Sequence, residues 1–248
     1  MKKITPFLFV LLTFLSCKNE NVLTTAPLVV NGEACEDCPK IDINIPEFID
    51  ESAASTTINT ALREEIISLL TFDDETEATT IEEATFSFKK GYDETKMMFT
   101  DETTPWEATI TGELTYEDKD FLSMALTSYL FTGGAHGYSS TTYLNFDKKQ
   151  GTELENWELF KDPEQFEKFA ETTFRKQEKV PQDAPINSTG FMFEEEIFTL
   201  PNNIGLTKEG LVLLYNQYEV ASYADGPITI TIPYNEVQNY LQVILEKK

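Results

Sequence analysis

The sequence predicts an α+β fold in which antiparallel sheets pack against a few amphipathic helices and the chain forms two sub-domains. Apolar residues alternate with period two in blocks, and helical patterns lie between these blocks. The regular strand–helix–strand alternation of a parallel sheet is missing. The chain has 248 residues, 41% of them hydrophobic, so it can bury a large core.

The first expected strand covers residues 41–45, where isoleucines alternate with polar residues up to Pro46. A helix should follow, with Ser and Thr residues between positions 52 and 57 available as caps. Its apolar residues share one helical face; they are Ile58, Ala61, Leu62, Ile66, Leu69 and Leu70.

A meander of antiparallel strands should follow the helix and pack against it. Ala84, Phe86 and Phe88 alternate, which indicates a strand followed by a turn over residues 89–93. Further strands are expected at 106–116, at 121–131 and at 138–146. The strand 121–131 is apolar on both faces and should be central.

The C-terminal part should begin with a helix, because Asp162 can act as its N-cap, Pro163 as its first residue and Gln165 as its third. Strands are expected at 198–200, 210–215 and 228–232, and a closing helix after Pro233. The sequence thus predicts four parts: a signal peptide (1–17), a polar tether (18–40), a first sub-domain (41–131) and a second sub-domain (132–248).

The first residues have the composition of an export signal. Lys2 and Lys3 precede twelve mostly apolar residues, which would rise only about 18 Å as a helix, too short to cross a membrane. Ser16 before Cys17 resembles a bacterial lipobox, although Phe14 and Leu15 depart from its stricter pattern. We therefore expect Cys17 to carry lipid and to anchor the protein in the cell envelope, outside the cytoplasm. A plain secretory signal with an incidental cysteine is the alternative.

Cys35 and Cys38 form a Cys-x-x-Cys pair at the end of the tether. A local disulfide, half of a zinc site and a redox pair are the three interpretations. Zinc needs four ligands and only His136 could add a nitrogen, so a local disulfide is favoured and no metal site is expected.

The charge of the chain constrains its partners. It has 43 acidic and 19 basic residues, for a formal charge of −24, and loss of Lys2 and Lys3 with the signal would make this −26. A nucleic-acid binder is excluded, because it would need Lys and Arg to neutralise phosphates. Such a surface attracts cationic partners at a distance, although acidity can also serve solubility alone.

Candidate site residues gather at a glycine-rich turn, residues 132–137. Gly133, Gly134, His136 and Tyr138 are the candidate binding residues, since glycines permit close backbone approach and His136 is the chain's single histidine. A purely structural turn is the alternative. The aromatic residues expected around it could stack against sugars or pack in the core; they are Tyr129, Phe131, Tyr138 and Tyr143.

No catalytic constellation is recognisable, and no cofactor is expected. A serine–histidine–acid arrangement would have to use His136, and nucleophile-elbow, phosphate-loop and dinucleotide motifs are missing. Residues 194–196 (three Glu) and the pair Asp118 and Asp120 could bind calcium or act as paired acids, but they lack calcium-loop spacing. The triplet at Asn187 is a glycosylation sequon by pattern.

Short motifs in a characteristic order resemble the extracellular domain pair of RsiV-type anti-sigma factors. The N-terminal half of this pair also accompanies PdaC-type peptidoglycan deacetylases as a non-catalytic module. The segments that carry the resemblance are 43–46, the Thr-Gly-Gly-Ala-His run within 131–137, 145–147, Gly151, Leu154, 159–162, Phe198, 206–207, 210–211, Tyr215, 218–221, 223–227 and 232–234. Together they cover roughly residues 41–245.

The resemblance implies an α+β fold and an envelope location. In the best-understood members it also implies binding of lysozyme, a strongly basic protein. Those sensors additionally have a cytoplasmic sigma-binding segment and a transmembrane helix, whereas this sequence has no run of 18 apolar residues after Cys17. We expect a non-enzymatic, lipid-anchored protein that binds a lysozyme-like basic protein or a cell-wall glycan such as peptidoglycan. An enzyme acting on glycans and a purely structural lipoprotein are the alternatives.

The lipid anchor can be tested on the protein isolated from membranes of its host. Mass spectrometry should find Cys17 as the first residue, carrying the mass of diacylglycerol and a further acyl chain, because two or more chains are needed for stable anchoring. A processed N-terminus without acyl groups would establish the plain secretory signal instead.

Overall fold

The α+β prediction is confirmed by the structure, a computed structural model that describes residues 22–32, 35, 37–72, 77–99 and 104–243. A six-stranded sheet has the order β1-β2-β3-β4-β5-β6 and a three-stranded antiparallel sheet has the order β7-β8-β9. The strands are β1 (Thr25–Asn31), β2 (Lys40–Phe48), β3 (Glu107–Glu117), β4 (Phe121–Phe131), β5 (Tyr138–Asp147), β6 (Thr152–Leu154), β7 (Asn203–Leu206), β8 (Gly210–Tyr215) and β9 (Ile228–Pro233). The helices are α1 (Ala53–Leu70), α2 (Ile81–Met98), α3 (Pro163–Gln177) and α4 (Tyr234–Val237), with short 3-10 turns at Asn156–Leu159, Ile186–Thr189, Glu194–Glu196 and Tyr223–Asp225.

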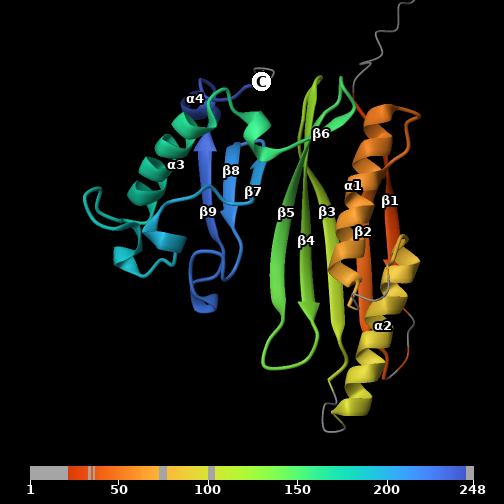
Figure 1. Cartoon of the computed structure of the whole chain (residues 1–248). Coiled ribbons are helices and arrows are strands. Elements are labelled where there is room, and N and C mark those ends of the chain that lie inside the picture. Colours follow the sequence, from red (N-terminus) through yellow and green to blue (C-terminus); the bar gives the residue numbers. More distant parts are fainter. Residues whose placement is uncertain (1–21, 33–34, 36, 73–76, 100–103, 244–248) are drawn as a thin grey trace, which may run out of the picture.

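Two hydrophobic cores lie on different sides of the large sheet. Helices α1 and α2 cover one face of the strands β1–β5 and bury the first core there, whereas α3 and the small sheet enclose the second (Figure 1). Ser52 caps α1, since its side chain accepts a hydrogen bond from the Ser55 amide. Asp162 caps α3 in the same way, as its sequence predicts.

Helix α2 replaces the strand that the sequence analysis placed at residues 84–88, so that prediction was wrong. The buried residues Ile81, Ala84, Phe88 and Tyr92 follow helical spacing, whereas Phe86 is exposed. Thr80 caps the helix by accepting a hydrogen bond from the Glu83 amide. The period-two alternation was therefore a coincidence within one helical turn.

Two further expectations about the large sheet need correction, and a third stays untested. Residues 25–31, assigned to the polar tether, form the edge strand β1, so order begins before Ile41. Strands β2 and β3 pair in parallel, because α1 and α2 form a crossover connection that returns the chain to the same end. The sheet also runs on from β4 into β5, across the sub-domain boundary predicted at residues 131/132, and that division stays a prediction.

The C-terminal part differs from expectation in two places. The segment 198–200 is not a strand, so that prediction was wrong. Its apolar character reflects burial in the second core, where the Phe198 ring packs against Phe174 and Phe193. The closing helix is the single turn α4, after which Leu241 pairs with Phe160 in an isolated bridge.

A small polar cluster joins the two sheets. The Ser123 hydroxyl donates to Oδ1 of Asn145 (2.8 Å) and accepts from the Leu206 amide (3.1 Å), while Nδ2 of Asn145 donates to the Ile204 carbonyl (2.7 Å). The Thr115 hydroxyl donates to the Leu206 carbonyl (2.7 Å). We call these contacts the inter-sheet seam. It holds β7 against the face of the large sheet that α1 and α2 leave open.

The seam predicts a specific stability loss. Asn145 and Ser123 are almost fully buried, so Asn145→Ala leaves the Ser123 hydroxyl without its acceptor and the Ile204 carbonyl without its donor, and should lower the free energy of unfolding by about 1–3 kcal/mol. Thr127→Ala is the control, because its hydroxyl bonds Thr141 on the exposed surface and should change stability by less than about 0.5 kcal/mol. Urea unfolding followed by circular dichroism measures both; equal losses would contradict the role of the seam.

Candidate functional site

The glycine-rich turn between β4 and β5 lies against the segment 216–226, which follows β8. The Tyr223 hydroxyl donates to the Gly137 carbonyl and the Tyr138 hydroxyl to the Gln217 carbonyl, both at 3.2 Å. The Asn216 side chain accepts from the Thr141 amide (2.9 Å) and donates to the Thr141 carbonyl (3.0 Å). Two segments about 80 positions apart in sequence therefore form one surface.

Aromatic rings cover this surface. His136 stacks on Tyr223 with ring centroids 4.0 Å apart and an interplanar angle of 21°, and Tyr218 tilts against the same ring at 5.4 Å. Tyr218, Tyr138 and Tyr129 are 55%, 38% and 37% exposed. We call these five side chains the distal aromatic surface.

Glycine is required at two points of the turn for different reasons. Gly134 has a φ of 83° with open space around it, so its backbone conformation is the constraint. Gly137 lies under the Tyr129 ring, where a Cβ would approach the ring atoms to 2.6 Å. Gly134 thus allows the backbone conformation of the turn, and Gly137 allows the Tyr129 ring to pack against the turn.

The electrostatic character of the surface is acidic. Residues 129–143 and 216–226 contain two acids, Glu219 and Asp225, and no Lys or Arg. Burial, and then the charge of Glu219, raises the pKa of Tyr138, so this phenol stays neutral near pH 7. A cationic group approaching the rings would meet no repelling cation within these two segments.

The surface lies at one end of the large sheet. Strand register aligns Asn31 and Asp42 with Thr109 and Tyr129, so the β4–β5 turn is at the end of the sheet opposite to Thr25. Figure 1 shows the same arrangement, with the turn far from the point where the described chain begins.

The predicted binding residues are brought together in part by the structure. Gly133, Gly134, His136 and Tyr138 all lie at the turn beside the rings. Tyr143, which the sequence analysis grouped with them, lies farther along β5, where its ring packs against Gly205 of β7. Sequence reasoning missed Tyr218 and Tyr223; the positive φ of Tyr218 (68°) left no sequence signal, although both tyrosines lie in the segments that carry the family resemblance.

The side chain of His136 is exposed on the surface. Its Nδ1 lies 3.1 Å from the Gly137 carbonyl and its ring stacks on Tyr223. Among the described residues no serine hydroxyl or carboxylate lies within hydrogen-bond distance of it. The geometry thus offers an aromatic contact and gives no partner for proton transfer.

The other candidate groups have local structural contacts. Oδ1 of Asp118 accepts from the amides of Asp120 and Phe121 (both 2.8 Å), and Oδ2 accepts from the Tyr116 hydroxyl (2.7 Å). Residues 194–196 are exposed side chains of a 3-10 turn. Within the described ranges no group of three or more His, Cys, Asp and Glu could hold a metal ion.

Two further sequence motifs can be placed. Cys35 and Cys38 form a disulfide with Cα atoms 5.3 Å apart, whereas Cys17 lies outside the described residues. The Asn187 amide group is engaged on both sides, donating to the Phe193 carbonyl and accepting from its amide (both 2.8 Å). The sequon asparagine therefore closes a loop.

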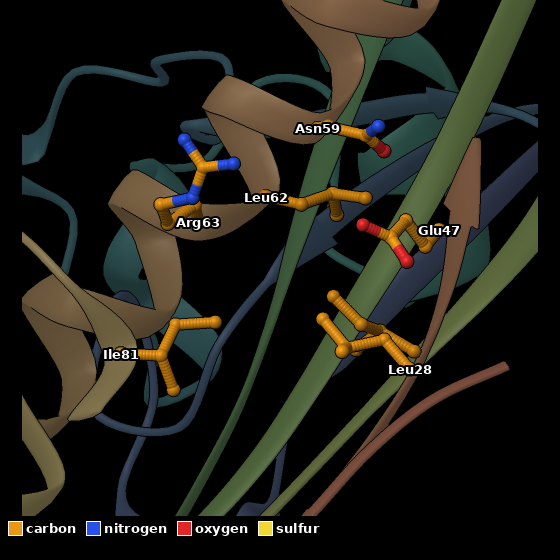
Figure 2. A pocket seen from close by; sticks show the side chains of 7 residues that line it. Leu28, Glu47, Asn59, Leu62, Arg63 and Ile81 are labelled. Carbon is orange, nitrogen blue, oxygen red and sulfur yellow. The ribbon is translucent and has the colours of Figure 1, made fainter. Parts of the chain in front are cut away.

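A small cavity between α1 and the sheet is too narrow for a cofactor. Its volume of about 30 Å³ suits one or two water molecules. Leu28, Leu62 and Ile81 line it, and Glu47 and Arg63 lie on opposite sides (Figure 2).

In the part of the chain that the structure describes, no helix is long and apolar enough to cross a membrane.

The structural role of Asp118 can be separated from calcium binding. Asp118→Ala should lower the free energy of unfolding by about 1–3 kcal/mol, because three donors lose their acceptor, whereas Asp120→Ala should leave it nearly unchanged. Thermal unfolding with and without millimolar Ca²⁺ checks this. A calcium-dependent rise in melting temperature that both variants abolish would restore the calcium interpretation.

Comparisons with known proteins agree with this architecture. Residues 33–139 match the family model described as "Deacetylase PdaC", and residues 158–235 match the one described as "Protein of unknown function (DUF3298)". No curated protein matches the chain.

Two solved structures share the fold. A DUF3298 family member from Bacteroides fragilis NCTC 9343 is 22% identical, with a TM-score of 0.69, and the alignment covers 91% of this chain and 96% of that one. A DUF3298 family protein from Pseudomonas aeruginosa PAO1 is 22% identical, with a TM-score of 0.65 and coverage of 91% and 97%. The chain therefore combines a PdaC-type segment with a DUF3298-type segment in the fold that DUF3298 family structures have.

Proposed function

We propose that the protein is a non-enzymatic, lipid-anchored protein of the cell envelope that binds a basic protein of the lysozyme type through the distal aromatic surface. The observation that carries this proposal is a set of exposed tyrosine rings in two segments that hold acids and no Lys or Arg. The resemblance to RsiV-type domains supports lysozyme as the partner to test first.

The physical basis is the chemistry of aromatic rings and carboxylates. Tyrosine faces attract Lys and Arg side chains by about 0.5–1 kcal/mol at exposed sites. The formal charge of −24 raises the encounter rate with a basic partner, and salt screens this effect. Strand β1 begins at Thr25, at the end of the sheet opposite to the distal aromatic surface, so an anchor at Cys17 would leave this surface facing away from the membrane.

A cell-wall glycan is the second partner that the rings would accept, because sugars also stack on tyrosine. The charge separates the two candidates. A neutral glycan gains little from the surrounding carboxylates, and its binding should hardly depend on salt, whereas binding of a basic protein should weaken strongly.

Calorimetric titration of the chain from residue 18 onwards with lysozyme tests the proposal. The affinity should fall at least tenfold between about 0.02 M and about 0.2 M salt. Tyr218→Ala should weaken binding about fivefold to tenfold at low salt, because it removes the most exposed tyrosine ring of the surface. Trp157→Ala is the control, since this exposed aromatic residue lies beside β6 at the other end of the sheet.

Two results would refute the proposal in different ways. Failure to form a complex at low salt removes lysozyme as the partner, and neutral chitooligosaccharides binding without salt dependence would then favour the glycan. Release of muropeptides from peptidoglycan by the wild-type chain, lost in His136→Ala, would show that the protein is an enzyme.

A further inference from the structure

Strand β1 forms an open edge of the large sheet. It comes first in the strand order, and among the described strands it pairs with β2 alone; Figure 1 shows it at the outer border of the sheet. The described residues before it lead away from this edge, because the Leu23 amide donates to Oε1 of Glu117 at the end of β3 (3.0 Å). The edge is therefore accessible to another strand.

The backbone groups of every second residue of β1 point outward from this edge. The Gly32 amide donates to the Ile41 carbonyl (2.8 Å), and the Ile49 amide donates to the Thr24 carbonyl (3.0 Å). Antiparallel pairs alternate between bonded and non-bonded positions, so the even-numbered residues of β1 bond to β2 and the odd-numbered ones face away from it. The outward residues are Thr25, Pro27, Val29 and Asn31. Within the described ranges, no hydrogen bond reaches their backbone N–H and carbonyl groups.

The edge has no charged side chain, although 25% of the residues in the chain are charged. Residues 21–32 contain no Asp, Glu, Lys or Arg. Natural proteins commonly protect an open edge with charged side chains, especially Lys, or with proline. The protection on β1 is Pro27, which lacks an N–H but keeps an accepting carbonyl. Two copies with a formal charge of −24 repel each other, and this edge lets their backbones approach without bringing like charges together.

The sequence of β1 is complementary to itself in one antiparallel register. Placing Leu28 opposite Leu28 of a second copy aligns the two strands over their full length, from Thr25 to Asn31. Ala26 then faces Val30 of the other copy, so apolar side chains meet on the core side of the sheet. Leu28 and Val30 are half-buried and pack against the first core, and a second copy would bury them further.

The same register satisfies most of the outward backbone groups. Thr25 and Asn31 would exchange both backbone hydrogen bonds, and the Val29 amide would donate to the Pro27 carbonyl. The Val29 carbonyl faces the proline nitrogen and would bond to water. A register centred on Pro27 would place the two prolines opposite each other and satisfy fewer groups.

We propose that β1 pairs with β1 of a second copy of this chain, antiparallel about Leu28, and joins the two large sheets into one continuous sheet. Two-fold symmetric dimers are the commonest soluble oligomers, and strand addition at a sheet edge is a recurring mode of recognition. The two chain starts lie at opposite ends of the joined sheet, so the dimer is a different arrangement from a single upright copy. It shares no residue with the distal aromatic surface and does not rest on the proposed function.

Cysteine cross-linking tests the register in the chain from residue 18 onwards, whose native cysteines are joined in the Cys35–Cys38 disulfide. Position 28 would lie opposite itself at a non-bonded pair, where Cα atoms are about 4.5 Å apart, within the range of about 4.4–6.8 Å that a disulfide needs. Leu28→Cys should therefore form a covalent dimer under mild oxidation. Val29→Cys is the matched control, because this side chain is more exposed but would face Pro27 of the other copy.

Sedimentation at rising protein concentration measures the dimer without cross-linking. Pro27→Val supplies an N–H to the Val29 carbonyl of the other copy and should strengthen dimerisation about tenfold. Val29→Pro removes the opposing donor and should weaken dimerisation about tenfold or more. It breaks no hydrogen bond of the single copy, because this N–H faces outward. Higher salt should strengthen the dimer, since it screens the repulsion between two acidic copies, whereas it should weaken lysozyme binding.

Three results would overturn the proposal. The first is equal cross-linking of Leu28→Cys and Val29→Cys, which would show random collision. The second is a Val29→Pro dimer as strong as that of the wild type, which would place the interface elsewhere. The third is a wild-type chain that stays monomeric at every concentration and salt, which would leave the edge to a strand of another protein. Failure of lysozyme binding would not affect any of these measurements, so the two proposals can fail separately.

Discussion

The inter-sheet seam is the contact on which the rest of the molecule depends. It places a buried serine and asparagine, Ser123 and Asn145, between two hydrophobic cores, and satisfies both with backbone groups of β7. A buried polar group is favourable only when it is fully bonded, so β7 can dock in one register and not in others. Gly205 adds a steric condition, since a Cβ there would lie 1.9 Å from Cδ1 of Tyr143. The hydrogen bonds of the seam therefore attach the small sheet to the large one, and the close contact at Gly205 fixes its register.

The seam also explains why the candidate site exists at all. The PdaC-type match ends at residue 139 and the DUF3298-type match begins at residue 158, so the β4–β5 turn and the segment 216–226 fall in different matches. Docking of β7 on β3–β5 brings β8 alongside, and the chain leaving β8 then meets the turn. His136 and Tyr223 can stack only because the two sheets share this fixed arrangement.

Local signals in the sequence predicted local structure well and long-range structure poorly. Asp162 with Pro163 predicts the start of α3 because a capping interaction involves only neighbouring residues. Helix α2 was missed because three alternating residues cannot separate a strand from one turn of helix, and its buried face shows only over the twelve residues from Ile81 to Tyr92. The parallel pairing of β2 with β3 depends on where two helices return the chain, which no pattern within either strand records. For the site, the glycine turn was visible in sequence, whereas the approach of Tyr218 and Tyr223 depends on sheet docking.

The outer face of the large sheet shows how one layer can serve two purposes. Where β7 covers it, the outward-facing polar side chains of β3–β5 are buried in the seam and bond to backbone groups of β7. Where no second layer covers it, on β1 and β2, the same face carries Asp42 and Asn44 and stays in water. A proline in the covered half would leave a buried carbonyl without a donor, which costs about 1–3 kcal/mol. Pro46 lies in the uncovered half, where water can satisfy a carbonyl that lacks a donor, and the pairing of β2 with β3 can end at Asn44 and Thr111 for that reason.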